Sequence, residues 1–378
     1  MPASVPLKLD FNERPFIAIW ETTQACDLAC VHCRACAQPL RSPLELSTRE
    51  AKGLIDEIAG MQVPLFVLTG GDPLKRPDIF ELVEYATKLD VRISLTPSAT
   101  PLLTREAIEN LKSAGLARLA VSLDGSRSAI HDAFRGVVGS YDWTLRAIRW
   151  ARDIGLPVQI NTTIMRRNLA DFEDLVRLLE TLDIVLWSVF FLVPMGRGQT
   201  DDLVSAEEFE SVFAKLYEVS CRAPFDIKTT EAQHYRRYVA QRRAEERRHS
   251  LLAVSHRPTR ESPDGIGRAP LSINDGKGFV FISHKGDVYP SGFLPLAAGN
   301  IRGQSLQKIY RDSPLFIALR DTSNLRGKCG ECEFQEICGG SRSRAYALAG
   351  DPFAEEPCCV YEPGGCERIS KATKGRPR

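Results

Sequence analysis

The sequence lacks a long hydrophobic run and has no excess of charge of either sign. Its longest apolar stretch, Ile184 to Val193, is about half of what a membrane-spanning helix needs. Lysine and arginine number 49 against 48 acidic residues, which gives no electrostatic reason to expect nucleic acid or a membrane as a partner. The N-terminus also lacks the apolar core of a signal peptide. We therefore expect a cytoplasmic protein that binds neither nucleic acid nor membrane.

Cysteine is the residue type that stands out in an otherwise ordinary composition. The 378 residues include 11 cysteines, and disulfides are not expected because reducing compartments keep thiols reduced. The cysteines gather in two groups: Cys26, Cys30, Cys33 and Cys36, then Cys329, Cys332, Cys338, Cys358, Cys359 and Cys366. These groups at opposite ends of the chain indicate two metal sites. Cys221 stands alone and is expected to be a small buried hydrophobic residue.

Short apolar runs alternate with amphipathic segments from residue 16 to about residue 200. The predicted strands are Phe16–Trp20, Leu65–Thr69, Arg92–Thr96, Arg118–Leu123, Val158–Thr163 and Ile184–Val193. The predicted helices are Thr48–Ala59, Ile79–Leu89, Arg105–Ala114, Trp143–Ile154, Phe172–Leu182 and Ser205–Cys221. Ser47 with Glu50 and Asp78 with Glu81 fit helix-capping patterns. The alternation predicts an α/β fold with a parallel sheet and outer helices, either doubly wound or a barrel.

Changes in composition along the chain suggest five segments. We expect an N-terminal extension (1–15), an α/β core (16–221), a helical or loop linker (222–270), a small cysteine-rich domain (271–366) and a basic tail (367–378). The linker begins with an arginine-rich run over 236–249, expected as a solvated helix, and continues with a Pro- and Gly-rich mobile loop. A lid or a patch for an anionic substrate is the alternative interpretation of the linker.

Cys26, Cys30 and Cys33 form a C-x3-C-x2-C motif directly after the first predicted strand. Three thiolates on one short loop can bind three irons of a [4Fe–4S] cluster, which leaves the fourth iron open to a non-protein ligand. A closed zinc site needs four ligands, and His32 or Cys36 keeps that alternative open.

This motif resembles that of the radical S-adenosylmethionine (SAM) superfamily. The resemblance implies a partial (β/α)6 TIM-type barrel with a small C-terminal iron–sulfur domain. It also implies a [4Fe–4S] cluster on Cys26, Cys30 and Cys33 that reductively cleaves SAM to a 5′-deoxyadenosyl radical. A low-potential protein such as flavodoxin or ferredoxin would donate the electron.

Further motifs occur at the ends of predicted strands, where barrels bind their ligands. Thr69-Gly70-Gly71-Asp72-Pro73 is similar to the family's GGE motif, with Asp72 in place of Glu, and would accept hydrogen bonds from the SAM ammonium. In a second motif, beginning Ser122-Leu123-Asp124-Gly125, Arg135 would pair with the SAM carboxylate; a surface ion pair is the alternative. The implied SAM-binding residues are Gly70, Gly71, Asp72, Ser98, Ser122, Asp124, Arg135, Asn161 and Val193. Asn161 could equally be a satisfied interior polar group.

The C-terminal cysteines resemble the auxiliary-cluster extension called SPASM. The resemblance implies one auxiliary [4Fe–4S] cluster, with Cys358 as the alternative fourth ligand to Cys359. The implied ligands are Cys329, Cys332, Cys338 and Cys359. Ser291 and Arg342 occupy positions where the full extension has cysteines, so a second auxiliary cluster is not expected.

Segments 290–295 and 338–347 narrow the resemblance to a subgroup that contains an iron-coproporphyrin decarboxylase, the haem d1 side-chain enzyme and the mycofactocin maturase. It implies oxidative modification, such as decarboxylation, of a carboxylate-bearing small molecule such as a porphyrin propionate. Arg342 and Arg344 would hold the carboxylate, or else cap the cluster. A maturase acting on a short ribosomal peptide is the alternative enzyme. A non-enzymatic iron–sulfur redox or iron sensor is the alternative outside enzymes.

Overall fold

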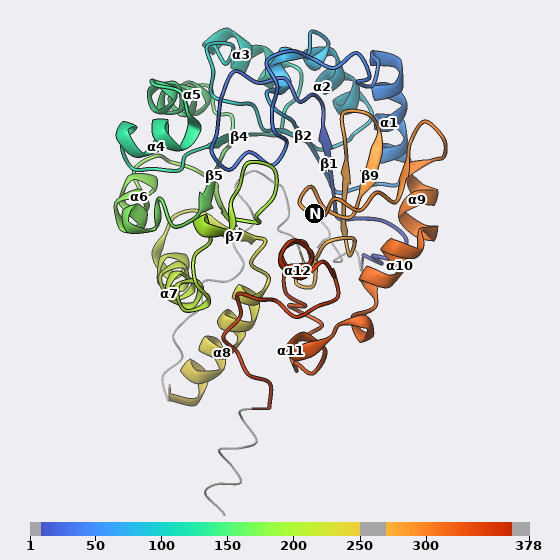
Figure 1. Cartoon of the computed structure of the whole chain (residues 1–378). Helices are drawn as coiled ribbons and strands as arrows, with labels where there is room; N and C mark the ends of the chain where they lie inside the picture. Colours follow the sequence, from blue (N-terminus) through green and yellow to red (C-terminus); the bar gives the residue numbers. More distant parts are fainter. Residues whose placement is uncertain (1–8, 250–269, 365–378) are drawn as a thin grey trace, which may run out of the picture.

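The computed structural model describes residues 9–249 and 270–364, and its central feature is a ten-stranded sheet. The strand order is β10-β9-β8-β1-β2-β3-β4-β5-β6-β7. The strands are β1 (Ile17–Glu21), β2 (Leu65–Thr69), β3 (Ile93–Leu95), β4 (Arg118–Ser122), β5 (Val158–Ile164), β6 (Leu186–Phe191), β7 (Asp226–Thr230), β8 (Phe279–Ile282), β9 (Asp287–Tyr289) and β10 (Gly299–Asn300). Strands β1 to β8 pair in parallel, and β9 and β10 are antiparallel. Among the described strands β7 and β10 remain edges, so the curved sheet is a partial barrel (Figure 1).

Helices follow the parallel strands and cover the outside of the curved sheet (Figure 1). The outer helices are α1 (Thr48–Gly60), α2 (Ile79–Lys88), α3 (Arg105–Ser113), α4 (Ser128–Arg135), α5 (Ser140–Asp153), α6 (Phe172–Leu179) and α7 (Ala206–Arg222). The later helices are α8 (His234–His249), α9 (Leu306–Asp312), α10 (Pro314–Arg320), α11 (Gly327–Gly330) and α12 (Arg342–Ala349). The expected capping box of Ser47 and Glu50 is confirmed. Asp78 makes no capping bond, because Arg76 and Thr48 bind its carboxylate instead.

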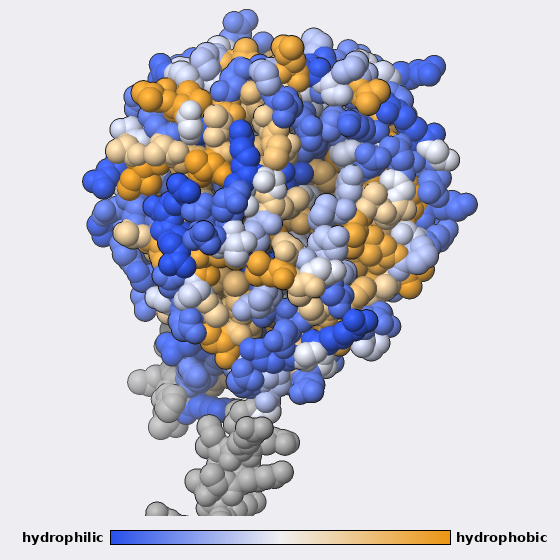
Figure 2. All heavy atoms as spheres, in the orientation of Figure 1, coloured by the Kyte–Doolittle hydropathy of each residue, from blue (hydrophilic) through white to orange (hydrophobic). Residues whose placement is uncertain are grey.

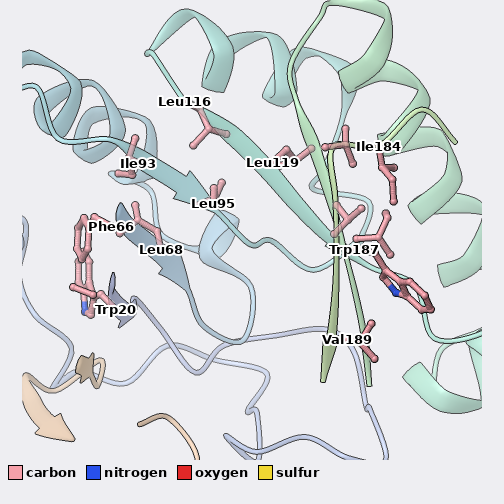
Figure 3. Packing of buried hydrophobic residues seen from close by; sticks show 14 of the residues in the cluster. Trp20, Phe66, Leu68, Ile93, Leu95, Leu116, Leu119, Ile184, Trp187 and Val189 are labelled. Atoms are coloured by element: carbon pink, nitrogen blue, oxygen red, sulfur yellow. The ribbon is translucent and has the colours of Figure 1, made fainter. Parts of the chain in front are cut away.

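The main core lies between the sheet and the outer helices. In β1 and β2, Trp20, Phe66 and Leu68 are fully buried and point to this layer, and in β6 Trp187 and Val189 do the same (Figure 3). Because successive side chains of a strand point to opposite faces, the residues between them face the barrel interior. This alternation decides which polar side chains reach the interior.

Four strands extend the sheet beyond the six that were predicted for residues 16–200, and two of them, β7 and β8, are parallel to their neighbours in the core. Strand β7, with the sequence Asp-Ile-Lys-Thr-Thr, pairs with β6 inside the segment expected as a linker. All five of its residues are half-buried, so it lacks the apolar run that marks a buried strand. Strand β8, in the expected cysteine-rich domain, pairs in parallel with β1 and continues the same sheet.

Two further predictions concern the arginine-rich run and Cys221. The arginine-rich run is helical, as part of α8. Cys221 is exposed, so its expected burial is wrong: it lies on the solvent side of α7, next to the buried Val219. Most of the expected mobile loop, the basic tail and Cys366 lie outside the described residues.

No helix in the described part of the chain has the length and apolarity to cross a membrane. On the face shown in Figure 2, hydrophobic side chains occur in small groups among hydrophilic ones.

Candidate active site

The first cysteine motif forms a loop directly after β1. Cys26 and Cys30 are buried, Cys33 is half-buried and all three thiols are free. Each sulfur accepts a hydrogen bond: Cys26 from the Leu28 N–H (3.3 Å), Cys30 from Arg135 Nη1 (3.7 Å) and Cys33 from the Ala37 N–H (3.4 Å). Donors of this kind stabilise thiolates and tune iron–sulfur clusters.

The donor set of this loop fits an iron–sulfur cluster, because it offers three thiols on one short segment. A cubane cluster binds its thiolates through different irons, so its ligands need not converge on one point. Cys36 differs from the buried Cys26 and Cys30, because its side chain is exposed and its backbone has a positive φ of 47°.

The two glycines after β2 pack directly against the backbone of the cysteine loop. The Gly71 N–H donates to the Thr23 carbonyl and the Asp72 N–H to the Ala25 carbonyl, each at 2.7 Å. A Cβ on Gly70 would lie 2.5 Å from the Thr23 oxygen, and one on Gly71 would lie 2.5 Å from the Ala25 oxygen. These distances are shorter than atoms tolerate, so both positions require glycine.

A cavity of about 140 Å³ opens beside these glycines, at the carboxyl ends of β2, β3 and β4. Five of the residues implied for SAM line it: Gly70, Gly71, Ser98, Ser122 and Arg135. Ser98 Oγ donates to the Gly71 carbonyl at 2.7 Å and lies 3.2 Å from Cys26 Sγ. The cavity and the cysteine loop are therefore one site.

Several polar residues of the cavity were not singled out from the sequence. They are Thr69, Thr96, His131, Ser140 and Thr144. His131 Nδ1 accepts a hydrogen bond from the Asp124 N–H at 3.1 Å, and burial lowers its pKa to about 3. Its place in the motif that begins at Ser122 is the signal that could have identified it.

Arg135, which lines the cavity, forms a buried ion pair with Asp124, which does not line it. The Thr163 N–H also donates to Asp124 Oδ1 at 2.8 Å. Burial raises the pKa of Asp124, although the Arg135 guanidinium opposes this shift. The pair lies inside the protein, so the surface alternative for Arg135 is wrong. Arg135 Nε is buried and has no hydrogen-bond partner among the described residues.

Besides Asp124, three residues implied for SAM do not line this cavity. Asp72 is fully buried, accepts hydrogen bonds from Thr100 Oγ1 (2.9 Å) and the Leu74 N–H (3.1 Å), and has its pKa raised to about 6 by burial. Asn161 accepts from Gln159 Nε2 at 2.6 Å, and Val193 is buried. Asp72 thus braces the turn after β2, and a direct SAM contact of these residues stays a prediction.

The C-terminal cysteines surround a second cavity. Cys329, Cys332, Cys338 and Cys359 all line it, and each sulfur accepts a backbone N–H: Glu356 to Cys329 (3.3 Å), Gly340 to Cys338 (3.4 Å), Phe334 to Cys332 and Tyr361 to Cys359. Cys358 does not line this cavity but packs in the main hydrophobic core. The adjacent cysteines therefore face different surroundings.

Arg342 and Arg344 are both buried and held by protein groups, so neither is free to hold a substrate carboxylate. Arg342 Nη1 donates to the carbonyls of Pro352 (2.9 Å) and Ala354 (2.6 Å), and its Nη2 lies 3.7 Å from Cys329 Sγ. Arg344 pairs with Glu356 at 3.0 Å. The expectation of carboxylate binding is wrong for both residues, and the capping alternative fits Arg342.

Known proteins share both parts of this arrangement. The radical SAM superfamily matches residues 20–179, and SPASM, described as an iron–sulfur cluster-binding domain, matches residues 274–333. The chain is 43% identical over 346 residues to the AdoMet-dependent heme synthase of Nitratidesulfovibrio vulgaris, covering 91% of this chain and 92% of that protein. The chain belongs to the radical SAM superfamily.

Two further comparisons agree with the family and with the fold, respectively. The AdoMet-dependent heme synthase of Methanosarcina barkeri is 41% identical over 350 residues, with coverage of 93% and 97%. The crystal structure of Streptococcus suis SuiB bound to S-adenosylmethionine has a TM-score of 0.69 at 16% identity, covering 92% of this chain and 78% of that chain; this likeness shows the fold. The partial barrel, the enzymatic role and the cofactors SAM and iron–sulfur cluster are thus confirmed, and the sensor alternative is wrong.

Proposed function

We propose that this radical SAM enzyme oxidatively decarboxylates propionate side chains of an iron porphyrin. The observation that carries the proposal is the 43% identity, over nearly the full length of both chains, to a protein named AdoMet-dependent heme synthase. The structure is consistent with this proposal because it has two cysteine sites in one fold. The first lies beside the SAM cavity, and the second lies in the C-terminal segment.

The proposed ligands of the SAM-binding cluster are Cys26, Cys30 and Cys33. The proposed ligands of the auxiliary cluster are Cys329, Cys332, Cys338 and Cys359. When bound, the first cluster supplies the electron that cleaves SAM to a 5′-deoxyadenosyl radical, and the second supplies an electron acceptor. Arg135 and Ser122, which line the cavity, would orient the ligand in it.

The reaction balances only if an electron leaves the substrate. Removal of a hydrogen atom from the carbon next to the ring turns –CH2–CH2–COO⁻ into a carbon-centred radical. Loss of carbon dioxide and one electron from that radical then gives a vinyl group, –CH=CH2. A second redox site in the same chain meets this requirement.

Anaerobic turnover with iron-coproporphyrin III, SAM and reduced flavodoxin tests the proposal. We expect a vinyl product by mass spectrometry and one 5′-deoxyadenosine for each propionate lost. Cys26→Ala should make neither compound. Accumulation of 5′-deoxyadenosine with no change of the porphyrin would contradict the proposed substrate and would direct the search to peptide substrates.

A further inference from the structure

A row of polar residues crosses the inner face of the barrel from the SAM cavity to the edge strand β7. The strand register places Ser122 of β4 opposite Asn161 of β5, Asn161 opposite Ser188 of β6, and Ser188 opposite Lys228 of β7. Paired residues of neighbouring strands share a face of the sheet. Ser122 lines the cavity, so the row starts at the site already described.

The opposite face of these strands belongs to the core. In β6, Trp187 and Val189 pack in the main hydrophobic cluster on the helix side (Figure 3). Ser188 and Phe190 therefore point into the barrel. Phe190 contacts Phe293, with 6.3 Å between ring centroids, so the C-terminal segment packs against this part of the interior.

Two buried hydroxyls beside Lys228 have no hydrogen-bond partner among the described residues. Ser188 is 1% exposed, and its Oγ is unpartnered, as is Oγ1 of Thr230. Thr230 is two residues after Lys228 on the same strand, so the two share a face. A buried polar group without a partner is destabilising, and a ligand that accepts hydrogen bonds removes this cost.

Lys228 adds a positive charge to these hydroxyls. It is half-buried, and its ammonium has three donors, so it can bind a ligand in addition to a protein group. Asp226 shares this face one level deeper in the barrel, opposite Leu186. Arg342 and Arg344 are fully buried and held by protein groups, whereas Lys228 is half-buried.

We propose that Lys228, with the hydroxyls of Ser188 and Thr230, binds a carboxylate of the substrate inside the barrel. Lys228 is three strand spacings, about 14 Å along the sheet, from Ser122. An extended substrate with several carboxylates could place one at Lys228 and another at the SAM cavity. The inference rests on the proposed function, and it makes β7 part of the substrate site.

Absorbance titration of the cluster-loaded protein with iron-coproporphyrin III measures this contact without turnover. We expect Lys228→Met to weaken binding at least 10-fold, Ser188→Ala to weaken it several-fold, and Lys228→Arg, which keeps the charge, to bind within a few-fold of wild type. The tetramethyl ester of the same porphyrin lacks the carboxylates, so its binding should not respond to Lys228→Met. Lys215→Met, on the solvent side of α7, is the matched control.

The outcomes separate this inference from the proposed function. Equal binding of the acid by wild type and Lys228→Met would overturn the carboxylate site and leave the proposed function intact. If Lys228→Met weakened binding of the acid and of the ester equally, with unchanged iron content and circular dichroism, Lys228 would shape the cavity without binding a carboxylate. That result would also overturn the carboxylate site. If the wild type bound neither porphyrin, both proposals would fail.

Discussion

Gly71 lies against the carbonyl of Ala25 so closely that a Cβ would sit 2.5 Å from the oxygen. Gly71→Ala must therefore push the cysteine loop away from β2. We expect the variant to lose the first cluster and retain the auxiliary one, so that reconstituted iron falls from about eight to about four per chain. Iron and sulfide analysis after anaerobic reconstitution measures this loss.

Gly53→Ala is the matched control for Gly71→Ala. Gly53 is exposed in α1, and nothing lies within 4 Å of a Cβ placed there. Alanine should keep the full iron content and stabilise the helix by up to about 1 kcal/mol. A full iron content in Gly71→Ala would contradict the close packing of the two loops.

Cys359 and Cys358 are neighbours in sequence that face different surroundings. Cys359 lines the auxiliary cavity, whereas Cys358 lies in the hydrophobic core. We expect Cys359→Ala to lose about four irons. Cys358→Ala should keep them and lose only some unfolding free energy. The reverse pattern in iron analysis would assign the ligand to Cys358.

The buried pair of Asp124 and Arg135 should contribute strongly to stability. Asp124→Asn leaves the Arg135 guanidinium without its carboxylate partner, and breaking a buried pair costs about 3–5 kcal/mol. Urea unfolding of the cluster-free protein measures the loss. Asp142→Asn on α5 is exposed and should change the unfolding free energy by less than about 0.5 kcal/mol. Similar midpoints for both variants would contradict this assignment.

The sequence predicts the parts of this fold and site that follow from periodicity or from dense motifs. Apolar runs and helical spacing identify β1 to β6, and the three spaced cysteines identify the first thiolate loop. Strand β7 was not predicted because its five residues are half-buried and mostly polar. Its polarity is the same property that makes it a candidate for binding substrate.

Side-chain partners cannot be read from sequence spacing. Arg344 is paired with Glu356, 12 residues later, and Asp124 with Arg135, so candidates for free cations and anions turned out to be bound to the protein. Asp72 faces Thr100 rather than the cavity. Such choices depend on how separate loops pack, which a single sequence does not encode in any local pattern.

Glu231 should make the stability of the protein depend on pH. It is buried directly after β7 and accepts hydrogen bonds from Ser341 Oγ (2.5 Å) and Ser291 Oγ (3.3 Å). Burial raises its pKa to about 8; Asp275 and Glu356 add to the shift, and Arg344 opposes it. Between its ordinary pKa of 4.5 and this raised value the folded protein holds a proton that the unfolded chain releases, so stability falls as pH rises.

Glu231→Gln tests this dependence because it keeps the shape and removes the titration. In the wild type, the unfolding free energy should fall by up to about 1.4 kcal/mol per pH unit between pH 5 and 8 from this group. The variant should show a flatter profile and gain stability relative to wild type at pH 8. Glu106→Gln, exposed on α3, should follow the wild-type profile. Parallel profiles of wild type and Glu231→Gln in urea unfolding would mean that Glu231 is ionised in the folded protein throughout this range.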